Sequence, residues 1–147
     1  MARVDYYVIE QEIQRILQDE LIGVTITVET DQPMDSHPWV SVYLMSREAP
    51  SGQPIAAGTQ TRFRLRFSVW CWCWSLESSE AAAKLRDGLL GDVEIALMKH
   101  RKLGNRVLSS WLEGGEMSVT NYQDDAGVTA YVSGGEVVLV AEVLAAI

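Results

Sequence analysis

Hydrophobic and polar residues alternate strictly along residues 61–75, the longest such pattern in the chain. Successive side chains of a β-strand point to opposite faces, so this pattern predicts a strand. One face of the strand is apolar and comprises Phe63, Leu65, Phe67, Val69, Cys71 and Cys73. The other face begins with arginines and ends with tryptophans: Arg62, Arg64, Arg66, Ser68, Trp70, Trp72 and Trp74.

The predicted strand is long for a chain of this size. Fully extended, it would span roughly 50 Å at about 3.3 Å per residue. A compact chain of this length has a diameter of only about 40 Å. We therefore expect the strand either to bend at a bulge or to leave the globule and meet another molecule.

Three elements are predicted before this strand. Asp5 can cap a helix that runs to about Asp19, with isoleucines at helical spacing opposite Glu10 and other polar residues. Short strands follow at 24–29 and 40–45. Residues 47–60 contain two prolines and two glycines, so with their flanking strands they predict a β-hairpin arm with a long loop.

A second helix is predicted after the long strand. Ser78 or Ser79 can cap it, and it should run to about Leu90 with Leu85 and Leu89 facing inward. Gly91 follows in the sequence and predicts a kink or a break there.

The last third of the chain reads as β-structure. Strands are predicted at 107–112, 117–120, 128–132 and 136–143, and Gly134 with its neighbours predicts a tight hairpin turn between the last two. The order of elements predicts one α+β domain over residues 1–147. Its sheet should be mainly antiparallel, with two helices packed on one face and a long β-hairpin arm.

The expected core draws on the long strand and the second helix, and consists of Phe63, Leu65, Phe67, Trp70, Trp72, Leu85 and Leu89. Three tryptophans left in water would form a patch too large for a stable monomer. We therefore expect the second helix, through the small residues 81–83, to cover Trp70 and Trp72.

The three arginines on one strand face would repel each other unless acids or phosphates oppose them. Because the chain carries a formal charge of −8, we expect acids of another subunit to compensate them. Nucleic acid is the rival source of negative charge. The candidate subunit or tube interface comprises Arg47, Pro50, Pro54, Ile55, Arg62, Arg64 and Arg66.

Catalytic and cofactor chemistry find little support in the sequence. Only two histidines are present, and no nucleophile motif, phosphate loop or paired metal-ligand motif occurs. Cys71 and Cys73 are two residues apart on one strand, which suits buried free thiols better than a disulfide. We expect no enzyme activity, no cofactor and no metal. No apolar run is long enough for a membrane span, and no secretory signal is visible, so we expect folding in a cytoplasm.

Several local motifs, taken in order, resemble the tail terminator proteins of long-tailed bacteriophages, and the resemblance covers about residues 5–112. The motifs are PWVSVYL at 38–44, LRFSVW at 65–70, AKLRD at 83–87, VEIAL at 93–97 and LG at 103–104. The resemblance implies a virion protein that forms a six-membered ring at the head-proximal end of the tail tube. It also implies that the ring stops tube polymerisation and offers a docking face to the head.

The partners implied by this resemblance are further copies of the chain, the tail tube protein and a head completion or connector protein. DNA would pass through the ring without specific binding, and assembly would take place in the host cytoplasm. An acidic lumen would keep phosphates from sticking, so we expect the three arginines to lie outside it.

Three other interpretations stay open from the sequence. The protein could be another neck or tail-completion protein of related fold. It could be a small nucleic-acid-binding module that uses Arg62, Arg64 and Arg66. It could also be a tail-assembly factor that is absent from the finished particle.

Overall fold

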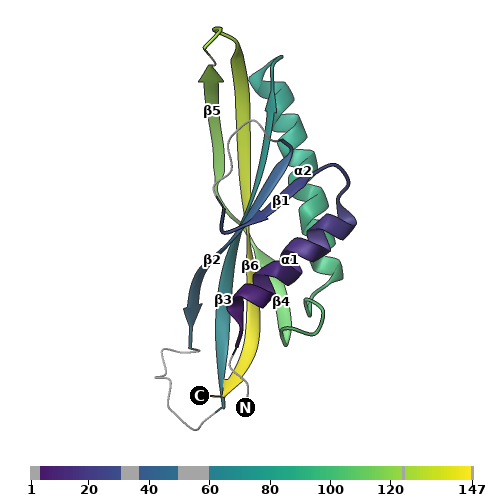
Figure 1. The fold of residues 1–147 in the computed structure, drawn as a ribbon, viewed down its shortest axis with the longest axis vertical. Coiled ribbons are helices and arrows are strands. Elements are labelled where there is room, and N and C mark those ends of the chain that lie inside the picture. The colour runs from purple at the N-terminus through teal and green to yellow at the C-terminus, as the bar shows by residue number, and fades with distance from the viewer. Residues whose placement is uncertain (1–3, 31–36, 50–59, 124, 147) are drawn as a thin grey trace.

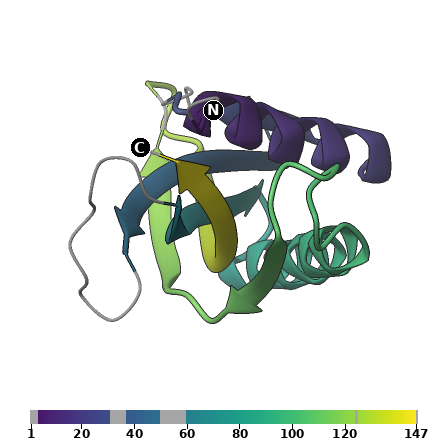
Figure 2. The same cartoon turned by 90° about the horizontal axis from the view of Figure 1, so that it is seen from below.

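The computed structural model describes residues 4–30, 37–49, 60–123 and 125–146. Its elements are α1 (Tyr6–Glu20), β1 (Thr25–Val28), β2 (Trp39–Glu48), β3 (Gln60–Ser75), α2 (Ser79–Lys99), β4 (Ser109–Glu113), β5 (Met117–Gln123) and β6 (Thr129–Ala146). The sheet has the order β1-β2-β3-β6-β4, and β5 also pairs with β6 (Figure 1). Only β1 and β2 are parallel to each other. Both helices lie on one side of the sheet (Figure 2), which confirms the predicted α+β class.

The first half of the chain follows its local signals closely. The Asp5 carboxylate accepts a hydrogen bond from the Val8 N–H at 3.2 Å and caps α1. Gly23, with a φ of +75°, lies in the turn between α1 and β1, where a left-handed conformation favours glycine. The antiparallel β2–β3 pair confirms the predicted hairpin.

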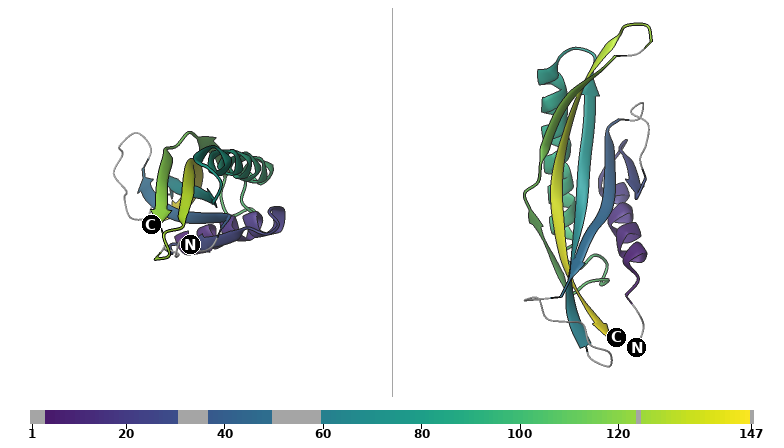
Figure 3. Two further views of the ribbon diagram at one scale, coloured as in Figure 1. Left: turned by 90° about the horizontal axis from the view of Figure 1, so that it is seen from above. Right: turned by 90° about the vertical axis from the view of Figure 1, so that its left-hand side faces the viewer.

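The long strand β3 neither bends away nor leaves the sheet. It pairs with β6 without interruption from Gln60↔Ala146 to Ser75↔Tyr131. The bulge lies instead in β2, between Leu44 and Ser46. Two long strands side by side make the molecule elongated rather than spherical (Figure 3), and that is how so long a strand fits in this chain.

The predicted hairpin turn at Gly134 is wrong, because β6 is one continuous strand through this point. Gly134 lies opposite Trp72 on β3, and a Cβ there would clash with the Trp72 ring. On the other face, a Cβ on Gly135 would lie 3.2 Å from Leu90 of α2. The two glycines therefore serve close packing on both faces of the strand rather than chain reversal.

The predicted break at Gly91 is also wrong, since α2 is a continuous helix of 21 residues. Ser78 caps it by accepting a hydrogen bond from the Ala81 N–H at 3.0 Å. Val93 and Leu97, beyond the glycine, are buried and extend the apolar face. Their packing outweighs the cost of about 1 kcal/mol of one glycine in a helix.

The core lies between the helices and the apolar face of the sheet. Phe63, Leu65 and Phe67 are each at most 1% exposed, and Leu89 is 7% exposed. Leu85, expected to face inward, is 51% exposed. It shares a helical stripe with Gly88, and that stripe faces a surface groove rather than the sheet.

Candidate assembly surface

The face of the sheet that is turned away from the helices collects all five tryptophans of the chain; we call it the open face. Trp70, Trp72 and Trp74 alternate with the core residues of β3 and therefore point away from α2. Trp39 lies opposite Trp72, and Trp111 lies opposite Val140, on the same side. The open face thus has two parts along β3. We call the part around Trp70, Trp72 and Trp74 the aromatic half, and the part formed by Arg62, Arg64 and Arg66 the arginine half.

The expectation that α2 covers Trp70 and Trp72 is wrong, because Cys71 and Cys73 occupy the helix side of β3. The two tryptophan rings instead stack on each other, with centroids 5.2 Å apart. The Trp72 ring also lies over Gly134. Both side chains are partly buried, so the tryptophans shield one another where no helix covers them.

Acids of the same chain compensate the arginine half, which corrects the expectation of acids from another subunit. Arg64 Nε lies 3.6 Å from Glu142 on β6. Arg66 Nη1 lies 3.0 Å from Glu113 on β4, and its Nε lies 3.5 Å from Glu48 on β2. Neighbouring strands place these residues beside one another in register or on the diagonal, as cross-strand pairs do.

These ion pairs make the arginine half less suited to binding phosphate, because the guanidinium groups already have acidic partners. The hydrogen bond and the charge of Glu113 raise the pKa of Arg66, with a smaller effect from Glu48. The Arg64 guanidinium lies over the Trp111 ring, 5.6 Å from its centroid. Arg62 is the most exposed of the three, at 65% of its side chain, and its contact with Glu142 is long, at 3.9 Å. Arg62 is therefore the arginine best placed to contact another molecule.

Arg47, also predicted at the interface, does not lie on this face. Arg47 Nη1 donates to the Tyr6 hydroxyl at 3.4 Å, and its guanidinium lies 5.6 Å from the Tyr6 ring centroid. It therefore packs against the start of α1, on the helix side of the sheet. Pro50, Pro54 and Ile55 lie outside the described residues.

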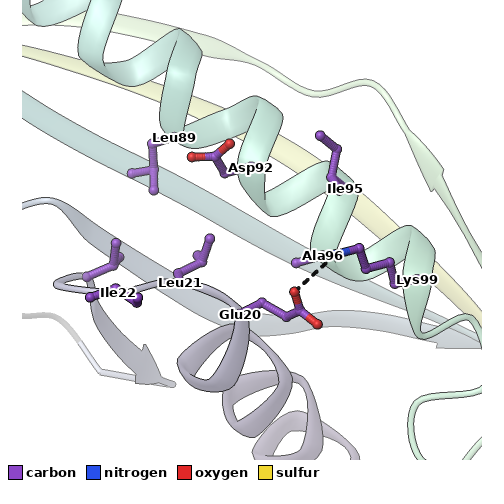
Figure 4. Close-up of a pocket in the computed structure, with 9 residues that line it drawn as sticks. Glu20, Leu21, Ile22, Leu89, Asp92, Ile95, Ala96 and Lys99 are labelled. Atoms are coloured by element: carbon purple, nitrogen blue, oxygen red, sulfur yellow. Dashed lines mark hydrogen bonds and ion pairs between the residues drawn. The ribbon is translucent and has the colours of Figure 1, made fainter.

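A surface groove that sequence reasoning missed lies between α2 and the turn after α1 (Figure 4). Ile22 is 98% exposed and Ile95 is 59% exposed, and both line the groove. Glu20 Oε2 and Lys99 Nζ, 3.3 Å apart, form an ion pair at one end. The sequence could have predicted this groove, because Leu85 and Ile95 lie on the same stripe of a continuous helix. The predicted break at Gly91 placed the two residues in separate segments, so the shared stripe was not recognised.

Glu10 is a second feature that sequence reasoning placed wrongly, on the polar face of α1. Its side chain is only 3% exposed, and its Oε2 has no hydrogen-bond partner among the described residues. Burial raises the pKa of Glu10 to about 8, with further contributions from the hydrogen bond and the charge of Glu29. Glu29 in turn accepts a hydrogen bond from the Leu44 N–H at 2.8 Å, so it also holds β2.

The two cysteines are buried in the fold, and His37 packs on a tryptophan. Cys71 and Cys73 are free and buried, and burial raises the pKa of both thiols, that of Cys73 to about 11. Such thiols are poor nucleophiles and poor metal ligands. His37 packs on Trp74 with ring centroids 4.1 Å apart, and burial lowers its pKa. Within the described ranges, no cluster of three or more His, Cys, Asp or Glu side chains is placed to hold a metal ion.

No helix in the described part of the chain is both long and apolar enough to span a membrane.

Comparisons with known proteins bear on the fold. No family model and no curated protein matches the sequence. Among solved structures, the chain is similar to the sheath/tube terminator of an extracellular contractile injection system (PVC) in the extended state. The TM-score is 0.50 at 11% identity, and the match covers 94% of this chain and 57% of that one. This chain therefore spans little more than half the length of that protein. At this identity the likeness concerns the fold alone, and the protein has a tail-terminator-like fold.

Proposed function

We propose that the protein is a tail terminator, a structural component that caps the head-proximal end of a tail tube. The observation that carries this proposal is the match of nearly the whole chain, 94%, to the fold of a sheath/tube terminator. In this role the protein stops tube polymerisation and presents a docking face to a head or connector protein. It works by binding and not by catalysis.

The acting form that we propose is a ring of six copies. An elongated subunit with different surfaces on its two sides suits head-to-tail contacts, which close into a ring at the right rotation. Six copies would carry a formal charge of −48, six times the −8 of one chain. An acidic lumen of this kind lets DNA pass without binding its phosphates.

The arginine half of the open face lies outside the lumen in this proposal. Arg64 and Arg66 are engaged with acids of their own sheet, and that pairing fits a structural role better than a contact with DNA. Arg62 and the arm at 47–60 are the parts that we assign to contacts with a neighbouring subunit or with the tube. The finished protein then resides in the neck of the particle, after assembly in the host cytoplasm.

The decisive experiment mixes the purified protein with isolated tail tubes of the system that encodes it. Light scattering gives the mass of the protein with and without tubes, and electron microscopy shows the tube ends. We expect a ring of about six copies, as the proposal implies, on one end of each tube, and no further growth of capped tubes. A monomer that ignores tubes would refute the proposal, and salt-sensitive binding to DNA would then favour the nucleic-acid-binding alternative.

A further inference from the structure

Two carboxyl groups meet where α1, the end of β1 and the bulge of β2 lie together, and α1 contacts both strands. Glu10 comes from α1 and Glu29 directly follows β1, and a hydrogen bond joins their side chains. The Leu44 N–H, beside the bulge, donates to Glu29 Oε1 at 2.8 Å. We call Glu10 and Glu29 the carboxyl pair.

Glu10 needs a proton to satisfy its hydrogen-bonding groups. Its side chain is 3% exposed, and its Oε2 has no hydrogen-bond partner among the described residues. Two ionised carboxylates can only accept hydrogen bonds, so they cannot bond to each other. A proton on Glu10 makes it a donor, and Glu29 then accepts.

No cation among the described residues takes the place of that proton. The cations of the neighbouring elements are engaged elsewhere: Arg47 of β2 with the Tyr6 hydroxyl, Lys99 and His100 of α2 with Glu20, and Arg15 of α1 with Glu12 and Asp19, while Arg106 acts on Glu12. On β3, the core residues Leu65 and Phe67 are apolar. The charge that acts on Glu10 is therefore the like charge of Glu29, which disfavours ionisation of both groups together.

The backbone at Glu29 is held in an uncommon conformation. Its φ is +50°, in the left-handed region that residues other than glycine seldom adopt. Two bonds to β2 hold it there, because its N–H donates to the Val42 carbonyl oxygen at 2.9 Å and its carboxylate accepts from the Leu44 N–H. Such a conformation persists only where its surroundings fix it. Its side chain is already exposed, so Glu29 can turn toward solvent if the pair is weakened.

The pair lies at the point where β2 changes register. Pairing with β3 shifts between Leu44 and Ser46, and Met45 within the bulge is 65% exposed. Below the bulge, residues 46–48 of β2 pair with β3 and lead into the arm. The bond from Leu44 to Glu29 thus fixes the upper side of the bulge.

We infer that the carboxyl pair is a pH-sensitive switch that fixes the bulge of β2. With a proton on Glu10, its O–H donates to the Glu29 carboxylate, which also accepts from the Leu44 N–H, so α1, β1 and β2 are joined at one point. When base removes the proton, two like charges face each other and one of them is buried. Glu29 then turns to solvent, and the Leu44 N–H loses its acceptor. The switch needs neither ring nor tube, so the inference goes beyond the proposed function and does not rest on it.

Amide hydrogen exchange of the wild-type protein, followed by NMR and expressed as protection factors, tests the switch. Burial raises the pKa of Glu10 to about 8, and above this pH each opening releases a proton that the closed state holds. We expect the protection factor of the Leu44 amide to fall by about tenfold per pH unit in that range. The Val69 amide, in the buried centre of β3, should keep its protection.

Conservative variants assign the effect to the pair. Glu10→Gln removes the ionisation, so the protection of the Leu44 amide should no longer depend on pH. Glu29→Gln removes the opposing charge but keeps an acceptor for the Leu44 N–H, and should remove most of the fall. Glu94→Gln, exposed on α2, should behave as the wild-type protein does. Arg47→Gln releases β2 from Tyr6 and should lower protection by the same factor at every pH.

Three results would overturn the inference. The protection of Leu44 in the wild-type protein could be independent of pH above about 8. Leu44 and Val69 could lose protection together, which would indicate global unfolding rather than a local switch. Addition of EDTA at neutral pH could release Leu44, which would show that a divalent cation, and not a proton, lies between the two carboxyl groups.

Discussion

Gly134 shows how one absent side chain shapes the sheet. Trp72 on β3 lies over it, and a Cβ at this position would clash with the ring. We expect Gly134→Ala to lower the free energy of unfolding by about 1–3 kcal/mol, the usual cost of overpacking. Gly114→Ala is the matched control, because nothing lies within 4 Å of a Cβ built there. Urea unfolding followed by tryptophan fluorescence measures both, and equal stability of the two variants would show that Trp72 moves aside freely.

The raised pKa of Glu10 predicts that the stability of the protein depends on pH. Its pKa is raised from 4.5 to about 8 in the folded state, so between these values the folded chain holds a proton that the unfolded chain has lost. The free energy of unfolding should therefore fall as the pH rises through this window, by at most about 1.4 kcal/mol per pH unit for one proton.

Glu10→Gln keeps the size of the side chain and removes its ionisation, so it should flatten this dependence. Glu94→Gln, exposed on α2, should leave the dependence unchanged. Urea unfolding from pH 5 to pH 8 provides the measurement. If the Glu10→Gln variant kept the slope of the wild-type protein, another group would be responsible.

At the scale of elements, α2 shows how tertiary packing overrides a local signal. Its apolar face continues across Gly91, and a Cβ there would meet nothing within 4 Å. We therefore expect Gly91→Ala to stabilise the protein by about 0.5–1 kcal/mol and to leave its helix content at least as high. Thermal unfolding followed by far-ultraviolet circular dichroism would measure both quantities. A destabilised variant would indicate that the helix needs a bend at this point.

On the open face, ion pairs connect β3 to the other strands of the sheet. The ion pairs of Arg64 and Arg66 join β2, β4 and β6 to β3, so the face is held by residues far apart in the sequence. Such exposed pairs each contribute little to stability, typically less than about 1 kcal/mol. Their main effect is to neutralise Arg64 and Arg66, so Arg62, with its long contact to Glu142, is the most exposed arginine of this face.

At the scale of the whole molecule, the arm can be shortened without removing a residue of the β2–β3 ladder. Residues 51–59 lie outside this ladder, since its last pair is Glu48↔Arg64. We expect a folded monomer with an unfolding temperature close to that of the wild-type protein, but with impaired ring formation on tube ends. Light scattering and electron microscopy measure the assembly. A Gly-Ser segment of equal length is the control that separates sequence from reach, and normal capping by the deletion variant would show that the arm is dispensable.

Local signals predicted the elements that depend on near neighbours. The Asp5 and Ser78 caps, the alternation along β3 and the β2–β3 hairpin all follow from residues close together in the chain. The assignment of Glu10 to a polar face failed because burial there depends on β2 and on Glu29, which the helix pattern does not contain. The interface residues of the arm and the single-domain organisation stay predictions.

The sequence by itself determined the class of the fold, the cap residues of both helices and the two faces of β3, because these follow from backbone periodicity and from hydrogen bonds within a few residues. Only the tertiary structure decided that Gly134 lies within a strand and that Gly91 lies within a helix. It also decided which acids meet the arginines and which apolar residues stay exposed. The physical reason is that each of these outcomes depends on what packs or pairs across the sheet, and strand register brings together residues as far apart in the sequence as Gln60 and Ala146, more than half of the chain.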